Sequence, residues 1–181
     1  IRIFSLATLI PGETDAEASA KLADYRRFVS EEGALVLFSG WTGIDLARLR
    51  PDEVVEHVRT EAGHAALENI TVADPAKRWT VGEVAAWGGI GGIGPVVAGT
   101  PARIADWMEE WVEATGVDGF NLAYALAHRT FSDVADLVVP ELTRRGRYKQ
   151  EYRAGTLRTK LGGPASGRLA DNHPAATFRR R

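Results

Sequence analysis

The chain has 181 residues, of which 45% are hydrophobic and 25% charged, and its formal net charge is −2. This length and composition are typical of one folded domain and exclude a disordered chain and a collagen-like one. The chain contains no cysteine, which also excludes disulfide bonds, cysteine zinc sites and thiol nucleophiles.

The first ten residues are apolar but too short to span a membrane, which takes roughly 18 residues, and they lack a basic leader. We therefore expect neither a membrane segment nor a signal peptide. The sequence begins with Ile1 rather than Met, so we expect it to be a piece of a longer protein.

The first predicted elements are a strand and a helix. Residues 2–10 are rich in Ile, Leu and Phe and stop at a Pro-Gly pair, the pattern of a buried strand. Thr14 and Glu17 have the spacing of a capping box, which predicts a helix that runs to about Glu32. Gly33 is expected to end that helix.

The middle of the chain has weaker signals. A helix is predicted from Pro51 to about Arg59, whereas residues 61–77 show no clean period and are interpreted as irregular. A second capping-box pair, Thr80 and Glu83, predicts a short helix that ends before a glycine-rich stretch.

The last part of the chain predicts a helix, a strand and a helix. Thr100 is followed by proline, a strong helix start, and Gly116 should end that helix. Residues 117–124 are predicted to form a strand, and Ser132 should cap the final helix. This order suits β/α units beside a parallel sheet. Two strands cannot form a stable parallel sheet alone, which is a second indication of a longer protein.

The segment from Gly89 to Gly94 fits the dinucleotide-binding pattern G-x-G-x-x-G letter by letter. That site requires a strand before the glycines and a helix after them. Here a predicted helix precedes the segment and Pro95 follows it. We therefore favour a flexible loop that borders a pocket over a dinucleotide site.

Isolated residues are weaker candidates for chemistry. The four histidines do not have metal-ligand spacing, so no metal site is expected. His128 follows a predicted strand, where β/α proteins carry their sites, although an exposed loop histidine is the simpler interpretation. Trp41 lies between glycines in a predicted loop, and Asp45 is either a helix cap or an acid of the site.

Charge is unevenly distributed along the chain. Residues 142–181 contain eleven Lys and Arg and two acids, for a formal charge of +9, and the remainder carries −11. We favour a solvated arm that packs on an acidic body or on a partner subunit over a nucleic-acid-binding tail, because no nucleic-acid module precedes it.

Several segments, taken in order, resemble one family over nearly the whole chain. They are Gly12–Ala18, Phe38–Leu46, Gly99–Asp106, Gly116–Leu122, Val138–Leu142, Arg145–Gly146 and Tyr152–Leu161. In these segments the chain resembles the bacterial-luciferase-like flavin monooxygenases, and within them the nitrilotriacetate monooxygenase branch.

The resemblance implies an α/β fold, the C-terminal portion of a (β/α)8 TIM barrel. Residues 1–150 would hold its last two strands, at residues 2–9 and 119–124, together with helices and a long insertion at about 34–99. Residues 151–181 would form a basic C-terminal arm.

The resemblance also implies an activity. Reduced FMN (FMNH2), supplied by a separate NADH:flavin reductase, would react with O2, and the flavin hydroperoxide would oxygenate a small organic substrate such as an aminopolycarboxylate or a sulfur heterocycle. The intact enzyme is expected to be a cytoplasmic homo-oligomer that binds neither nucleic acid nor membrane. The alternatives are a non-catalytic fragment or subunit, and a deazaflavin-dependent oxidoreductase of the same fold.

Strand-end geometry then gives two groups of candidate site residues. Those expected to contact the flavin are Ser5, Ala7, Gly94, Asn121 and Tyr124, and those expected in the substrate pocket are Trp41, Asp45 and His128. Asn121 and Tyr124 could hydrogen-bond a ring edge or the substrate. No catalytic residue is assigned, because the pocket histidine that some branches carry is replaced here by Gly94-Pro95.

Overall fold

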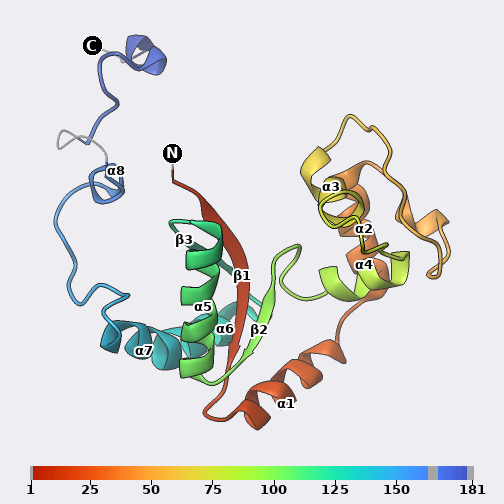
Figure 1. Ribbon diagram of the computed structural model, residues 1–181, viewed down its shortest axis with the longest axis horizontal. Coiled ribbons are helices and arrows are strands. Elements are labelled where there is room, and N and C mark those ends of the chain that lie inside the picture. Colours follow the sequence, from red (N-terminus) through yellow and green to blue (C-terminus); the bar gives the residue numbers. More distant parts are fainter. Residues whose placement is uncertain (1, 163–166, 179–181) are drawn as a thin grey trace.

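The computed structural model describes residues 2–162 and 167–178. Its centre is a parallel sheet of three strands, in which β1 (Phe4–Pro11) lies between β2 (Val96–Gly99) and β3 (Gly119–Ala123) (Figure 1). Thr8 pairs with β2 on one side and with β3 on the other. The expected parallel pairing of the first strand with the strand at 119–124 is therefore confirmed, whereas β2 was not predicted.

Helices cover one face of this sheet. They are α5 (Pro101–Thr115), α6 (Ala127–Asp133) and α7 (Val139–Arg144), with a π-helical turn (Val134–Val138) between the last two. Side chains alternate between the two faces of a strand. Ala7 and Leu9 of β1 point to this face, where they pack against Ile104 of α5 and Val138 of the π-helical turn. This packing forms the first hydrophobic core.

The helix α5 forms as the sequence predicts. The Thr100 hydroxyl accepts a hydrogen bond from the Arg103 N–H at 3.3 Å, and Pro101 takes the first helical position. Gly116 ends the helix in the left-handed region, with φ of 69°. The buried Ile104 fixes which side of the helix meets the sheet.

An ion-pair network joins α7 to α5. Arg145 donates to Glu141 and to Asp106, each at 2.6 Å. Hydrogen bonds from Arg144 and Arg145 lower the pKa of Glu141 to about 2. Glu141 therefore stays ionised over most of the pH range and holds the two arginines in place.

The first helix is shorter than predicted. α1 (Asp15–Arg26) ends before the expected stop at Glu32, and a new helix, α2 (Glu31–Thr42), follows it. The Ser30 hydroxyl accepts from the Gly33 N–H at 3.0 Å, so Ser30 is the N-cap of α2. Gly33 consequently lies in the first turn of a helix instead of ending one.

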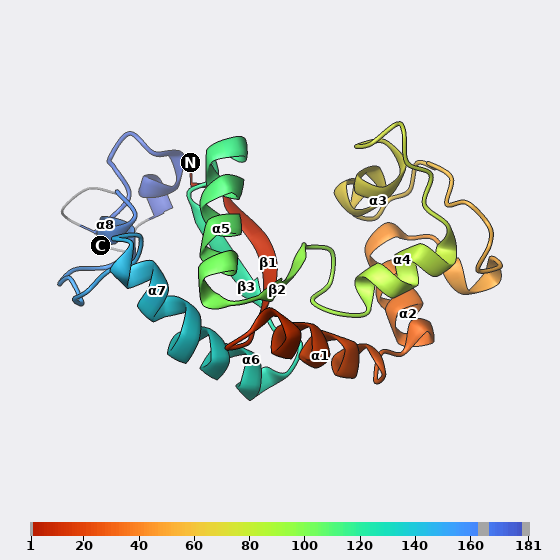
Figure 2. The ribbon, with the colours of Figure 1, turned by 60° about the horizontal axis from the view of Figure 1, so that its bottom comes forward.

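The segment between α1 and β2 has a hydrophobic core of its own. Its elements are α2, a short 3₁₀ turn (Leu46–Arg48), α3 (His64–Thr71) and α4 (Val81–Gly88). Figure 2 shows this group beside the sheet, with α1 leading into it. The core residues of the group include Phe38, Leu67 and Val84. The glycine-rich segment after α4 returns the chain to the sheet.

Two predictions in this region were wrong. Residues 51–59 do not form a helix, because the backbone there pairs elsewhere: the Val55 N–H donates to Trp79 and the Val81 N–H to Glu53, both at 2.9 Å. The stretch interpreted as irregular contains α3. The capping box ahead of α4 is confirmed by reciprocal Thr80 and Glu83 hydrogen bonds.

The last helical region starts earlier than predicted. It begins at Ala127, so Ser132 lies inside α6 and is not a cap. The Thr130 hydroxyl accepts from the Ala125 and Leu126 N–H groups at 3.2 and 3.1 Å and so closes the turn ahead of the helix. Asp133, the last residue of α6, forms an ion pair with Lys21 of α1 at 3.2 Å, which joins the two helices.

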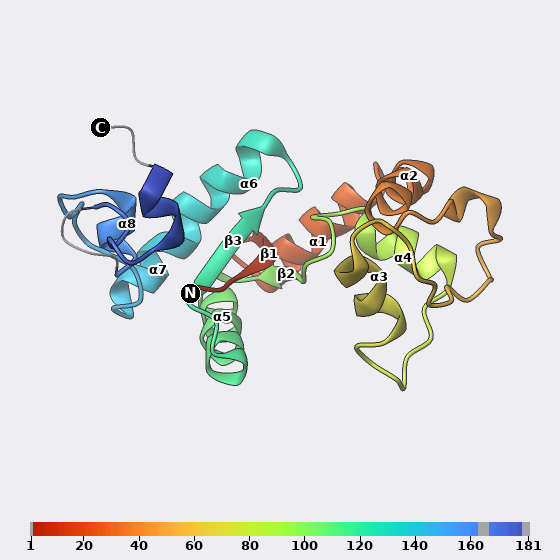
Figure 3. The same ribbon diagram turned by 90° about the horizontal axis from the view of Figure 1, so that it is seen from above.

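The C-terminal part of the chain packs loosely. It holds α8 (Leu157–Lys160) and a 3₁₀ turn (Pro174–Phe178), neither of which contains a buried residue. Seen from above, it lies on the opposite side of the sheet from α2, α3 and α4 (Figure 3). Among the residues that the structure describes, no helix is long and apolar enough to cross a membrane.

Candidate functional site

The second face of the sheet is the face that the helices leave open. Phe4 and Leu6 of β1 alternate onto it, and the strand register places Leu6 beside Asn121 of β3. Phe4 is 46% exposed and Asn121 is also exposed. Parallel sheets are almost always covered on both faces, so this apolar and amide surface is a place where further protein or a bound molecule packs.

Toward the ends of the strands, the glycine-rich segment lies directly on this face. A Cβ on Gly91, which has φ of 72°, would lie 1.8 Å from the Thr8 hydroxyl oxygen, and a Cβ on Gly94 would lie 2.8 Å from the Leu6 carbonyl oxygen. The Thr8 N–H donates to the Pro95 carbonyl at 2.9 Å. Glycine is therefore required where this backbone approaches β1.

The Thr8 side chain is fully buried beneath that segment, and its hydroxyl has no hydrogen-bond partner in the part of the chain that the structure describes. Buried polar groups are nearly always paired, because burial without a partner costs about 1–3 kcal/mol. Such a group is a local destabilising feature beside the strand ends.

A cavity of about 370 Å³ opens at the end of β3, between the end of α1 and the glycine-rich segment. Three aromatic rings, those of Tyr25, Phe28 and Tyr124, line it. Asp24 is its acidic residue, and no Lys, Arg or His is among the described residues that line it. Phe28 and Tyr124 are 77% and 56% exposed, so the cavity is an open recess that offers apolar ring surface to a bound molecule.

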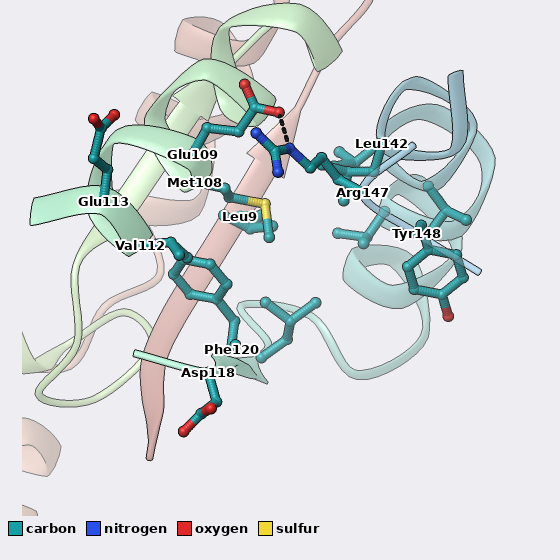
Figure 4. Close-up of a pocket in the computed structure, with 15 residues that line it drawn as sticks. Leu9, Met108, Glu109, Val112, Glu113, Asp118, Phe120, Leu142, Arg147 and Tyr148 are labelled. Carbon is teal, nitrogen blue, oxygen red and sulfur yellow. Dashed lines mark hydrogen bonds and ion pairs between the residues drawn. The ribbon is translucent and has the colours of Figure 1, made fainter. Parts of the chain in front are cut away.

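The carboxyl ends of parallel strands are where β/α proteins carry out chemistry. The cavity lies at the carboxyl end of β3, whereas the open face runs along the first half of β1 and β3, and together they form the candidate site. A larger cavity of about 780 Å³ lies on the helix-covered face, between α5 and α7 and near the start of β3 (Figure 4). It is separate from the candidate site.

The structure distributes the residues predicted to contact flavin over both faces. Tyr124 lines the cavity, Asn121 lies on the open face, and Gly94 packs on β1. Ser5 and Ala7 alternate to the opposite face, where Ala7 is fully buried in the first core. The structure therefore does not bring Ser5 and Ala7 together with Asn121.

The residues predicted in the substrate pocket are also dispersed. The ring of Trp41 belongs to α2, lies 5.4 Å from that of Phe38, and comes within reach of the glycine-rich segment at Gly92. Asp45 is exposed and pairs with Arg48 at 2.8 Å, and His128 is exposed in α6. Neither Asp45 nor His128 lines the cavity at the strand ends.

Sequence reasoning missed the contribution of α1. Tyr25 lies in the last turn of α1 and Phe28 two residues beyond its end, and both line the cavity. The signal was the Ser30 cap, which ends the predicted long helix early and leaves these rings at its end. No group of three or more His, Cys, Asp or Glu that could hold a metal is found among the described residues.

We compared the sequence of the chain with those of known proteins. No family model matches the chain. Dimethyl-sulfide monooxygenase of Hyphomicrobium sulfonivorans is 46% identical over 179 residues, which cover 99% of this chain and 37% of that protein. Long-chain alkane monooxygenase of Geobacillus thermodenitrificans is 35% identical over 179 residues, or 99% of this chain and 36% of that protein. The relatives are luciferase-like flavin monooxygenases.

Solved structures agree with the sequence matches. The crystal structure of DmoA from Hyphomicrobium sulfonivorans superposes with a TM-score of 0.79 at 45% identity, over 99% of this chain and 38% of that one. Riboflavin lyase, solved with modified FMN and riboflavin, gives a TM-score of 0.78 at 28% identity, over all of this chain and 39% of that one. The expected fold, a parallel-sheet portion of a TIM barrel, is confirmed.

The chain spans a little more than a third of the length of these relatives. Nitrilotriacetate monooxygenase component A of Aminobacter aminovorans is also a relative, at 31% identity over 153 residues. It is less similar than the dimethyl-sulfide and alkane enzymes. The expected nitrilotriacetate branch is therefore not the most similar part of the family.

Proposed function

We propose that this chain forms the C-terminal part of a flavin-dependent monooxygenase that oxygenates a small, uncharged organic molecule. The observation that carries the proposal is the match of 99% of the chain to two monooxygenases, at 46% and 35% identity. The sheet face that the helices leave open and the cavity with three aromatic rings at the end of β3 support the proposal. The division into residues 1–150, with an insertion at about 34–99, and an arm at 151–181 is part of the same proposal.

The open face has features that fit reduced FMN. Asn121 places an exposed amide beside the apolar Leu6 side chain, so one surface offers both a hydrogen bond and an apolar contact. Gly94 lets backbone lie close against the strand. In this proposal Asn121 holds the ring edge and Leu6 packs on the ring face. Reduced FMN and O2 would supply the chemistry, in which one oxygen atom enters the substrate, the other leaves as water, and FMNH2 becomes FMN.

The cavity at the strand ends favours one substrate class over another. Its described lining has aromatic rings and the Asp24 carboxylate but no cationic side chain. Asp24 already pairs with Arg27, at 3.3 Å, and the described lining itself offers an aminopolycarboxylate no cationic side chain. Uncharged sulfides or hydrocarbons would instead gain apolar contact with Tyr25, Phe28 and Tyr124. The two relatives cited first are named for dimethyl sulfide and for alkanes, which are uncharged.

A separate NADH:flavin reductase, a homo-oligomeric state and a cytoplasmic location complete the proposal. The relative named as component A of nitrilotriacetate monooxygenase supports a second component, for which we propose the reductase. The roles of Ser5, Ala7, Trp41, Asp45 and His128 stay predictions.

The test uses the intact protein with an NADH:flavin reductase and FMN. We expect O2-dependent oxygenation of dimethyl sulfide or a short alkane and no turnover of nitrilotriacetate. Tyr124→Ala should raise KM for the apolar substrate several-fold, and the control Tyr148→Ala, at the larger cavity, should leave it unchanged. Turnover with reduced deazaflavin and without O2 would contradict the proposal in favour of an oxidoreductase. No turnover with any substrate would favour a non-catalytic protein.

A further inference from the structure

Lys21 joins three parts of the chain at the carboxyl end of the sheet. Its ammonium group donates to the Pro11 carbonyl oxygen at 2.9 Å, and lies 3.1 Å from the Glu17 carboxylate and 3.2 Å from that of Asp133. Pro11 is the last residue of β1, Glu17 belongs to α1, and Asp133 is the last residue of α6. An ammonium group has three N–H donors, so each donor of Lys21 has an acceptor here.

This junction is charged and largely buried. The side chains of Lys21 and Asp133 are each 16% exposed. Burial lowers the pKa of Lys21, but its hydrogen bonds to Glu17 and Asp133 raise it by more, so the ammonium group stays charged at neutral pH. A buried charge that loses its partner is strongly unfavourable. The three acceptors therefore hold the Lys21 ammonium group in one place.

The junction lies one helical turn from the cavity with three aromatic rings. Tyr25 is four residues after Lys21, on the same side of α1, and lines that cavity. In α6, Thr130 is three residues before Asp133, and its hydroxyl accepts from the N–H of Leu126, which also lines the cavity. One wall of the cavity is thus carried by α1, and another by the loop between β3 and α6.

The two halves of α1 are held differently. In the first turn Ala18 is buried, and Asp15 accepts from the Thr100 N–H at 3.1 Å. In the second half Leu22 and Tyr25 are only partly buried. The charged contact that ties this half to β1 and α6 is the one made by Lys21. We therefore expect the position of the wall carried by α1 to depend on that side chain.

We propose that Lys21 is a positioning residue for the substrate cavity: through Asp133 it holds the wall carried by α1 in place against the loop between β3 and α6. Lys21 does not line the cavity, so it acts without touching the substrate. It has this role only if the cavity is the substrate site, so the inference rests on the function proposed above. Binding of a small apolar molecule depends on the spacing of the surfaces that it contacts. A looser spacing weakens binding more than it slows the chemistry.

Steady-state kinetics of the intact protein, with a flavin reductase, FMN and dimethyl sulfide, provide the first test. Lys21→Met keeps a long unbranched side chain and removes the charge; it should raise KM about five-fold and change kcat by less than about two-fold. Arg147→Met removes an ion pair with Glu109, at 2.9 Å, on the helix-covered face and should leave KM unchanged. A merely structural role for Lys21 would lower the amount of active protein, and so the apparent kcat, at an unchanged KM. That result, or an equal rise in KM for the control, would overturn the inference.

A second variant tests whether Lys21 acts through Asp133. Asp133→Asn keeps the size of the side chain and should also raise KM, and it repeats the test if Lys21→Met does not fold. Because both changes break one contact, the double variant should have a KM no higher than that of Lys21→Met. Effects of the two changes that multiply in the double variant would contradict the inference.

A distance measurement separates this inference from the proposed function. Spin labels on Phe28→Cys and Leu126→Cys, one on each wall, report the spacing of the walls in the intact protein, freed of any other cysteine, whether or not it turns over dimethyl sulfide. Lys21→Met should shift or broaden the distribution of distances between the labels, and Arg147→Met should not. An unchanged distribution in Lys21→Met would overturn the inference. A shifted distribution in a protein without oxygenation activity would support the positioning of the walls by Lys21 and contradict the proposed function alone.

Discussion

Replacing Gly91 by alanine tests the close approach of the glycine-rich segment to β1. Gly91 has φ of 72°, and a Cβ there would lie 1.8 Å from the buried Thr8 hydroxyl oxygen. The neighbouring Gly92 provides a matched control, since its φ is 79° but a Cβ there would meet only Trp41, at 3.6 Å. The two positions share the backbone conformation and differ in the space around it.

The expected magnitudes follow from these two contributions. A left-handed conformation costs a non-glycine residue about 1–2 kcal/mol, so Gly92→Ala should lower the free energy of unfolding by about that amount. Gly91→Ala adds an overlap with a fully buried residue of the central strand, which costs about 1–3 kcal/mol more. That difference corresponds to a melting temperature lower by about 2–12 °C in a domain of this size.

Urea unfolding of the intact protein, followed by circular dichroism, measures both variants under one set of conditions. Gly91→Ala should have the lower unfolding midpoint, with the m-value unchanged if only stability is affected. If the two variants were destabilised equally, the glycine-rich segment would not lie against Thr8, and the geometry of the candidate site would be wrong.

The other predictions concern stability. Thr8→Val removes a buried hydroxyl without a partner and keeps the shape of the side chain, so the free energy of unfolding should rise by about 1 kcal/mol. A lower melting temperature in thermal denaturation would mean that the hydroxyl is paired. Ile104→Ala, at the centre of the first core, should cost about 2–5 kcal/mol in the same assay, and a cost below 1 kcal/mol would contradict that packing. The depressed pKa of Glu141 means that its contribution to stability is present above its ordinary pKa of 4.5 and is lost as the pH falls to about 2. Glu141→Gln should therefore flatten the acid side of the stability profile, and an unchanged profile would show that the network with Arg145 does not stabilise the fold.

Local signals in the sequence predicted much of the fold. The caps at Thr14, Thr80 and Thr100 each act over three residues, so the information lies within a single turn. The strands β1 and β3 were predicted from short apolar runs bounded by Gly or Pro. These elements form where expected because no distant segment takes their backbone hydrogen bonds in a different pairing.

Tertiary contacts decided the rest. Residues 53–55 pair with the chain near Thr80 and so cannot form the predicted helix, and β2 exists only because it adds to the edge of β1. Asp133, which follows the expected cap Ser132, is held by Lys21 from a distant helix. None of these partners is close in sequence, which is why periodicity and caps could not reveal them.

The candidate site was predicted in part. Tyr124 lines the cavity because it follows a parallel strand, as strand-end geometry predicts. Ser5 and Ala7 lie on the opposite face of β1 from Leu6 and Thr8, so the structure does not bring them together with Asn121. Both faces of β1 are largely apolar, so the alternation that normally separates the faces of a strand is absent from this sequence.

Isotope labelling tests the central claim most directly. The intact protein, supplied with a flavin reductase, FMN and dimethyl sulfide under ¹⁸O2, should give a product that carries one ¹⁸O atom per turnover. Incorporation of oxygen from water, or turnover that continues when O2 is removed, would contradict the account.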